Sequence, residues 1–265
     1  MKKLISIFIL PACLCCYAQD TVPNAMRQYS ETELKILPVL WQQTAAEYRA
    51  LCYQAFNFAT LRLYQALMKK SAKRLAIITD LDETIIDNSY IYGNLIPQGK
   101  EFSAAEWKNW TSQSAATAVP GAIKFLQLAK QKRVAIFYIS NRDTSELFST
   151  VSNLKKLDLP DADTSHMLFL SNTSSKETRR QQIMKRYNVV MLLGDNLNDF
   201  MQVFERIPID ERNAEVDKLT SQWGRKFIVL PNATYGEWEN AIYDYDRKLS
   251  AEQKNLKRKE KLKGY

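Results

Sequence analysis

The sequence predicts an α/β fold, a doubly wound parallel sheet with a small, mostly helical cap and a long N-terminal helix. The main evidence is a series of short apolar runs at residues 75–79, 134–139, 167–170, 189–193 and 227–230. Each run is continuous rather than alternating, as expected for strands buried on both faces of a parallel sheet. Segments with helical features separate the runs. Strands and helices therefore alternate, which is typical of a doubly wound domain.

The first predicted helix precedes the first strand. Ser30 and Glu33 fit a capping box, in which each residue's side chain accepts a hydrogen bond from the other's backbone N–H. Apolar residues then recur at helical spacing from Leu37 to Ala59, which predicts one long amphipathic helix that can restart at Pro38. Further helices are predicted at residues 120–130, 145–157 and 175–187, between the apolar runs.

Residues 88–119 interrupt the alternation of strands and helices. The segment is too long for a simple crossover, and it contains Gly, Pro and several aromatic residues, among them Trp107 and Trp110. We expect it to form a small, mostly helical cap over the carboxyl edge of the sheet. The rest of residues 19–265 is expected to form a single domain with this cap as an insertion.

Composition and charge limit the class of protein. Of the 265 residues, 46% are hydrophobic and 25% are charged, which is ordinary for a globular protein. The net charge of +8 arises from Lys2, Lys3 and a basic tail at 247–265, which we expect to be helical, whereas residues 4–246 carry equal numbers of acidic and basic side chains. We therefore expect no binding to nucleic acid polymers. The basic tail could instead attract anionic substrates or lipid headgroups.

The first 18 residues resemble a secretory signal: a Lys pair, a short apolar run, and small residues that end at Ala18. Cleavage after Ala18 is one interpretation. The alternative is acylation of Cys13, which follows a lipobox-like sequence and would tether the protein to a membrane. Either way we expect an exported protein that is periplasmic or associated with the outer membrane or cell surface. Cleavage after Ala18 leaves Cys52 as the one cysteine, so no internal disulfide is expected.

Polar residues directly follow the apolar runs. The first run is followed by Asp80-Leu81-Asp82-Glu83-Thr84, the second by Ser140-Asn141-Arg142, and the fourth by a segment from Gly194 to Asp199, while Lys176 opens the helix after the third run. Taken singly, each has an ordinary interpretation as a helix cap, a turn or a solvated side chain. Ligands bind at the carboxyl ends of parallel strands, so their joint occurrence indicates one site.

The residue types indicate phosphoryl transfer. Four carboxylates, those of Asp80, Asp82, Asp195 and Asp199, would repel one another without a cation, and Mg²⁺ suits oxygen ligands where phosphate completes the coordination. We predict that Asp80 attacks phosphorus to form an aspartyl-phosphate and that Asp82 moves the proton. The phosphoryl oxygens would be held by three residues, Ser140, Asn141 and Lys176.

The motifs resemble those of the haloacid-dehalogenase (HAD) superfamily, and more narrowly its class C acid phosphatases, the bacterial lipoprotein 5′-nucleotidase family. The resemblance rests on DLDETIIDNSYIYG, SNR, SSKETRR and GDNLNDF, and extends to WQQTAAEYRALCYQAFNFA, W-x-x-W with VPGA, and PNATYGEWE. It implies a HAD-like fold, nucleoside monophosphate substrates, and a homodimer. It also implies that the base stacks between Trp107 and Tyr235. Tyr90 stands where many relatives have Pro.

Other interpretations remain open. His166 is the single histidine and Cys52 has no Cys-x₅-Arg loop, so phosphatases with a histidine or thiolate nucleophile are excluded. A broad acid phosphatase or phosphotransferase acting on other phosphomonoesters would use the same residues. A surface protein that binds a ligand, with incidental hydrolysis, is the alternative from another class. Trp110 and Trp238 are expected to pack the cap on the body rather than bind substrate.

Overall fold

The computed structural model describes residues 30–170 and 172–265, so the predicted signal at residues 1–18 and its alternative cleavage or acylation points, Ala18 and Cys13, lie outside the described residues. The central sheet is parallel, with strand order β5-β4-β1-β6-β7. Its strands are β1 (Leu75–Thr79), β4 (Ala135–Ile139), β5 (Met167–Leu168), β6 (Asn188–Gly194) and β7 (Phe227–Val229). The α/β class is confirmed.

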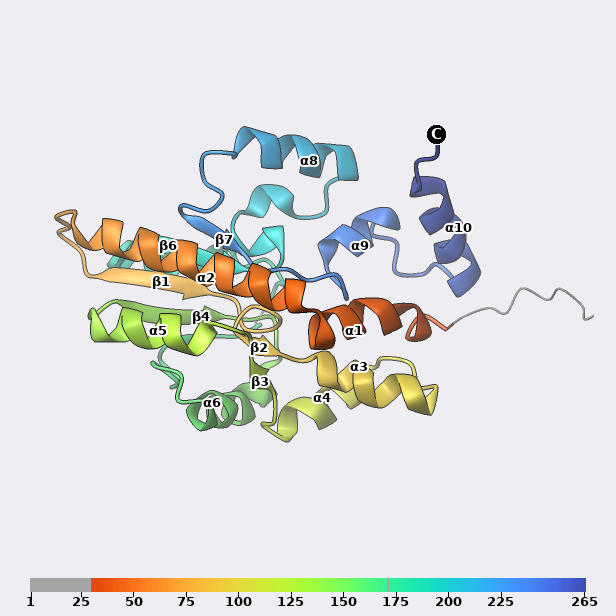
Figure 1. The fold of residues 1–265 in the computed structure, drawn as a ribbon, viewed down its shortest axis with the longest axis horizontal. Helices are drawn as coiled ribbons and strands as arrows, with labels where there is room; N and C mark the ends of the chain where they lie inside the picture. The colour runs from red at the N-terminus through yellow and green to blue at the C-terminus, as the bar shows by residue number, and fades with distance from the viewer. Residues whose placement is uncertain (1–29, 171) are drawn as a thin grey trace, which may run out of the picture.

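The sheet buries both of its faces, as the continuous apolar runs predict. Successive residues of a strand point to opposite sides. Ile77 of β1 accordingly belongs to the cluster that includes α2 (Ala46–Leu67) and α5 (Ala122–Gln131), whereas Ile78 belongs to the cluster on the other face. That second cluster includes Ile183 of α7 (Glu177–Arg186). Figure 1 shows α2 and α5 along the same side of the sheet.

The strand order places a topological switch point between β1 and β6. The chain passes from β1 outward to β4 and β5, then returns to β6 on the opposite side of β1 and continues to β7. The connections contain α5 with the cap, then α6 (Leu147–Lys156), α7 and α8 (Ile209–Lys218). Because the connections leave β1 and β6 in opposite directions, their carboxyl ends border a crevice, the usual ligand site of an open α/β sheet.

The N-terminal helix is interrupted, which corrects one detail of its prediction. The Ser30 and Glu33 capping bonds are present, at 2.9 and 3.0 Å, and the helix then passes Pro38 without a break. Pro38 lies in the first turn of α1 (Ile36–Thr44), where its missing N–H has no helical acceptor to lose. The break is at Ala45, whose ψ of 127° is extended. Because of this break the two helices pack on different partners. Helix α1 contacts the cap helix α3 (Ser89–Leu95), while α2 packs on α5, β6 and β7.

The cap is helical and is entered and left through a short antiparallel ribbon of β2 (Ile86–Asp87) and β3 (Thr117–Ala118). Between these strands lie α3, the 3₁₀ helix η2 (Ile96–Gln98) and α4 (Ala104–Ser112), whose first turn is capped by the Ser103 side chain. Figure 1 places α3 and α4 beyond the carboxyl end of β1. The cap therefore lies next to the edge of the sheet where the polar residues gather.

The C-terminal segment folds back on the N-terminal one. After α9 (Glu237–Ile242), helix α10 (Ala251–Lys261) forms within the basic tail and begins with a capping box at Ser250. Arg258 of α10 is ion-paired with Glu31 at 2.5 Å, so part of the tail's charge is neutralised locally. Among residues 30–170 and 172–265, no helix combines the length and apolar character that crossing a bilayer requires.

Candidate active site

Three carboxylates meet at the switch point. Asp80 follows β1, Asp195 follows β6, and Asp199 ends the 3₁₀ helix η4 (Leu197–Asp199); one oxygen from each lies within 4.8 Å of the others. The Asp80 N–H donates to Leu193 O at 2.9 Å, which ties the start of the loop to β6. A Cβ on Gly194 would lie 2.5 Å from the Asp199 side chain. Glycine at position 194 therefore allows η4 to bring Asp199 to the other two.

Lys176 lies between two of these carboxylates. Its Nζ is ion-paired with Asp80 Oδ1 and, at 2.6 Å, with Asp199 Oδ1. The side chain is 8% exposed. Burial alone would lower the pKa of Lys176, but the Asp199 and Asp80 carboxylates raise it above its ordinary value, so the ammonium stays charged. The sequence predicted this lysine at a helix start, and the structure places its ammonium between Asp80 and Asp199.

The acidic group is short of positive charge. Burial, with the charge of Asp199, raises the pKa of Asp195 to about 7. Burial also raises the pKa of Asp80 well above its ordinary value, against the opposing effect of Lys176. Both shifts mean that ionising these carboxyls is costly with a single ammonium to balance them. A cluster of buried carboxylate oxygens fits a hard divalent cation, which would remove that cost.

The Asp82 carboxylate, also predicted as a metal ligand, is not brought into this group. It is held by Arg142, whose Nη2 and Nε donate to Asp82 Oδ1 at 2.7 and 3.0 Å, and by Asn88, whose Nδ2 donates to the same oxygen at 2.9 Å. Neither Arg142 nor Asn88 was predicted to have a role. The sequence feature that pointed to Arg142 is its position, two residues after Ser140 at the carboxyl end of β4. Arg142 is buried there, and a buried guanidinium needs a carboxylate partner.

Of the other predicted phosphate-binding residues, Ser140 lies beside Asp82 and Asn141 does not. The Ser140 side chain is fully buried; its hydroxyl is 3.3 Å from Asp82 Oδ2 and accepts the Arg142 N–H at 3.1 Å. Asn141 is exposed, and its Oδ1 accepts from Arg179 at 2.6 Å. Ser140 thus contacts the predicted proton-transfer group, whereas the side chain of Asn141 is engaged by the start of α7.

Two further side chains orient Asp195. Asn232 Nδ2 donates to Asp195 Oδ2 at 2.8 Å, and the Thr84 hydroxyl is 3.1 Å from Asp195 Oδ1. The same hydroxyl is 3.5 Å from Asp80 Oδ2, so Thr84 lies between the two carboxylates. Both residues lie within motifs of the sequence, Thr84 in DLDETIIDNSYIYG and Asn232 in PNATYGEWE, but neither was predicted to have a function. Ligand carboxylates are commonly oriented by such outer hydrogen bonds.

The two predicted stacking residues come from different segments, Trp107 from the cap helix α4 and Tyr235 from the loop before α9. Trp107 and Tyr235 are half-buried and pack against one buried cluster, Val39, Ile91, Tyr92 and Leu95. The Arg142 guanidinium carbon lies 5.4 Å from the centre of the Trp107 ring, which joins Trp107 to the partner of Asp82. The Tyr235 hydroxyl donates to the buried Glu83.

The two tryptophans expected to pack the cap on the body, Trp110 and Trp238, differ in their contacts. Trp110 Nε1 donates to Asn88 Oδ1 at 2.9 Å, at the start of α3, and the Trp110 side chain packs against both the main core cluster and the cap cluster. Trp238 is 45% exposed, and its Nε1 donates to Tyr235 O at 3.2 Å. Trp110 therefore has the packing contact expected of it, whereas Trp238 lies on the surface beside the Tyr235 loop.

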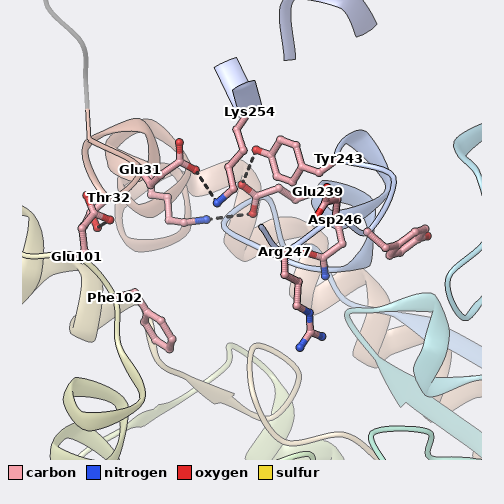
Figure 2. Close-up of a pocket in the computed structure, with 12 residues that line it drawn as sticks. Glu31, Thr32, Glu101, Phe102, Glu239, Tyr243, Asp246, Arg247 and Lys254 are labelled. Atoms are coloured by element: carbon pink, nitrogen blue, oxygen red, sulfur yellow. Dashed lines mark hydrogen bonds and ion pairs between the residues drawn. The ribbon is translucent and has the colours of Figure 1, made fainter. Parts of the chain in front are cut away.

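The cavity drawn in Figure 2 is separate from the acidic group. It has a volume of about 430 Å³ and lies between the N-terminal segment, the cap loop and the C-terminal segment. Figure 2 shows Glu31 joined to Lys254 at its rim, and Phe102 and Arg247 lower on its walls. Its lining includes none of the predicted site residues. The acidic group at the sheet edge is therefore the candidate active site, and this cavity is not.

Comparisons with known proteins indicate one family. A family model described as HAD superfamily, subfamily IIIB (acid phosphatase), matches residues 16–238. The class C acid phosphatase from Bacillus anthracis is 39% identical and superposes with a TM-score of 0.85 over 89% of this chain and 99% of that chain. A structure of the Bacillus anthracis class C acid phosphatase with tungstate bound gives 39% identity and a TM-score of 0.85 over 88% and 98% of the respective chains.

Proposed function

Since this chain belongs to subfamily IIIB of the HAD superfamily, the acid phosphatases, and is a phosphoric monoester hydrolase, we propose that it is a Mg²⁺-dependent nucleotidase that acts through an aspartyl-phosphate. The observation that carries the proposal is the meeting of Asp80, Asp195 and Asp199, with Lys176 paired to Asp80 and Asp199. The relative's structure with tungstate, a tetrahedral oxyanion like phosphate, supports a phosphate site in this family.

In the first half-reaction, an Asp80 oxygen forms a bond to phosphorus while the bond from phosphorus to the ester oxygen breaks. Asp82 gives its proton to the leaving oxygen, so the product leaves as an alcohol. Arg142 and Asn88 fix the position of the Asp82 carboxylate. The Lys176 ammonium is placed to balance the charge that spreads over the phosphoryl oxygens.

In the second half-reaction, water attacks phosphorus and gives its proton to Asp82, and the bond from phosphorus to the Asp80 oxygen breaks. Inorganic phosphate leaves, and both aspartates return to their starting states. A divalent cation held by Asp80, Asp195 and Asp199 would neutralise negative charge on the phosphoryl group. Thr84 and Asn232 hold Asp195 for that purpose.

A phosphate-release screen over nucleoside and sugar monophosphates tests the proposed function. We expect turnover with Mg²⁺, loss of at least about 90% of it in excess chelator, and recovery on adding Mg²⁺, because the buried carboxylates need a cation to be ionised together. Nucleoside monophosphates should be the better substrates. A strong preference for sugar phosphates would favour the broad acid phosphatase or phosphotransferase instead, and turnover that is indifferent to chelator would contradict the metal dependence.

The nucleotide preference depends on Trp107. We expect Trp107→Ala to raise KM for a nucleoside monophosphate by about tenfold, since stacking on an aromatic ring is worth about 1–3 kcal/mol per base. The same variant is assayed with a small aryl phosphate. Loss of the Trp107 ring could disturb Arg142 and, through it, Asp82, and such a disturbance would lower turnover of this substrate as well. Tyr64→Ala, at an exposed aromatic residue near the end of α2, is the control variant. Equal losses on both substrates would argue against stacking.

We also propose export from the cell, with residues 1–18 as the signal, on the composition of that segment alone. Fractionation of the producing cell tests it, and full retention of residues 1–18 in a cytoplasmic protein would contradict it. The basic tail supports a looser surface association, and the proposal of a homodimer rests on the family resemblance.

A further inference from the structure

One side chain joins the acidic group to the loop that carries Tyr235. The amide nitrogen of Asn232 donates to Asp195 Oδ2 at 2.8 Å. Its amide oxygen accepts the backbone N–H groups of Thr234 and Tyr235 at 2.8 and 3.4 Å. An Asn oxygen that caps the N–H two residues ahead is the usual way of fixing a tight turn. The two ends of this amide thus contact two different parts of the site.

The rest of the Tyr235 loop is anchored to α1 and its N-terminal flank. Lys35 Nζ donates to Thr234 O at 2.6 Å and is ion-paired with Glu239 at 3.2 Å. The Thr234 hydroxyl donates to Gln42 Oε1 at 3.3 Å. Thr234 is buried, so these bonds are shielded from water. The loop is therefore held against α1 and its N-terminal flank. The Asn232 amide in turn fixes the position of the loop relative to Asp195.

Tyr235 is held both at its backbone and at its side-chain hydroxyl. Its backbone N–H is bound by Asn232, and its hydroxyl donates to Glu83, which is buried and follows Asp82 directly in the chain. The ring itself packs beside Tyr92, with 6.4 Å between ring centres. A ring fixed in this way loses little conformational freedom when a flat group stacks on it.

We propose that Asn232 is a positioning residue that couples the Asp195 carboxylate to the Tyr235 ring. Building on the proposed nucleotidase function, the coupling gives one side chain control of two properties: the affinity for the divalent cation and the preference for a substrate that carries a base. A change at Asn232 alters both, whereas a change at Tyr235 alters the second alone.

Three variants test the coupling in the full folded chain. Asn232→Ala removes both halves of the contact. Asn232→Ser keeps a hydroxyl that accepts the Thr234 N–H but is too short to reach Asp195. Asn240→Ala removes an asparagine of the same C-terminal segment that binds Glu237 at 3.2 Å and has no bond to the acidic group, and it serves as the control.

Two readouts separate positioning from general damage. The first is the Mg²⁺ concentration that half-saturates the rise in thermal stability, measured without substrate. The second is the ratio of KM for a nucleoside monophosphate to KM for a small aryl phosphate. For Asn232→Ala we expect Mg²⁺ affinity to fall about tenfold, a typical loss for an outer partner of a metal ligand, and the KM ratio to rise at least about threefold. Asn232→Ser should lose Mg²⁺ affinity with the KM ratio near wild type.

A change in only one readout for Asn232→Ala, or in neither, overturns the coupling. Should Asn232→Ala fail to fold, Asn232→Ser still decides, because retention of wild-type Mg²⁺ affinity overturns it. Tyr235→Ala is measured in parallel to isolate the underlying function. An unchanged KM ratio in Tyr235→Ala refutes base recognition itself, whereas a raised ratio there with an unchanged one in Asn232→Ala refutes the coupling alone.

Discussion

Replacing Asp80 by Asn should reduce phosphomonoester hydrolysis by about 10⁴-fold or more, since a neutral amide cannot attack phosphorus and loss of a nucleophile typically costs that much. The substitution preserves size and one acceptor oxygen, so the bond from Lys176 and the contact with Thr84 can persist. The measurement is phosphate release with saturating Mg²⁺, together with thermal unfolding of each protein.

Thermal stability is the check on this result. Asp80 is buried and its pKa is raised, so a neutral Asn should leave the unfolding temperature close to that of the wild type or above it. The control is Asp210→Asn, at an exposed carboxylate in the first turn of α8, which should keep full activity. Asp80→Asn activity within tenfold of wild type would mean that another group is the nucleophile.

Lys176→Met should destabilise the metal-free protein by about 3–5 kcal/mol, because removing one partner of a buried ion pair leaves the others uncompensated. Here the uncompensated groups are Asp80 and Asp199, both buried. Turnover should fall by about 10²-fold or more, since the ammonium that balances phosphoryl charge is lost. Chemical denaturation with and without Mg²⁺, together with phosphate release, measures both effects.

The pH dependence of this variant has a defined sign. Lys176 lowers the pKa of Asp80, so its removal raises that pKa further above the unfolded value. The folded state then binds more protons than the unfolded state, and stability is greatest at low pH and is lost as the pH rises through the folded pKa. Lys185→Met, at an exposed lysine in the last turn of α7, is the control and should show neither the loss nor the altered slope. A Lys176→Met protein as stable as wild type would contradict the charge balance described above.

The sequence determined the edge of the sheet at which the site forms. Continuous apolar runs predicted the strands of a parallel sheet, and the polar residues that follow them then had to gather at the carboxyl ends. Asp80, Asp195 and Lys176 were found in this way because each lies within a few residues of a strand or helix end. Their positions near the ends of strands and helices were sufficient to predict that these three residues meet.

The break in the N-terminal helix depends on tertiary packing. Helical periodicity runs through Ala45 and gives no sign of an extended residue there. The interruption is explained by where the two halves pack, with α1 on the cap and α2 on the sheet layer. Local propensity carries no information about a second surface that lies elsewhere in the chain.

The sequence by itself determined the fold class and the strand ends that gather the acidic residues, because both follow from periodicity and from residues close together in the chain. Only the tertiary structure decided which partner each side chain takes. Asp82 binds Arg142 from 60 residues away, and Asn232 reaches Asp195 across 37. Such pairs depend on how strands and loops are placed in space and on which rotamers fit there, and no local pattern in the sequence records either.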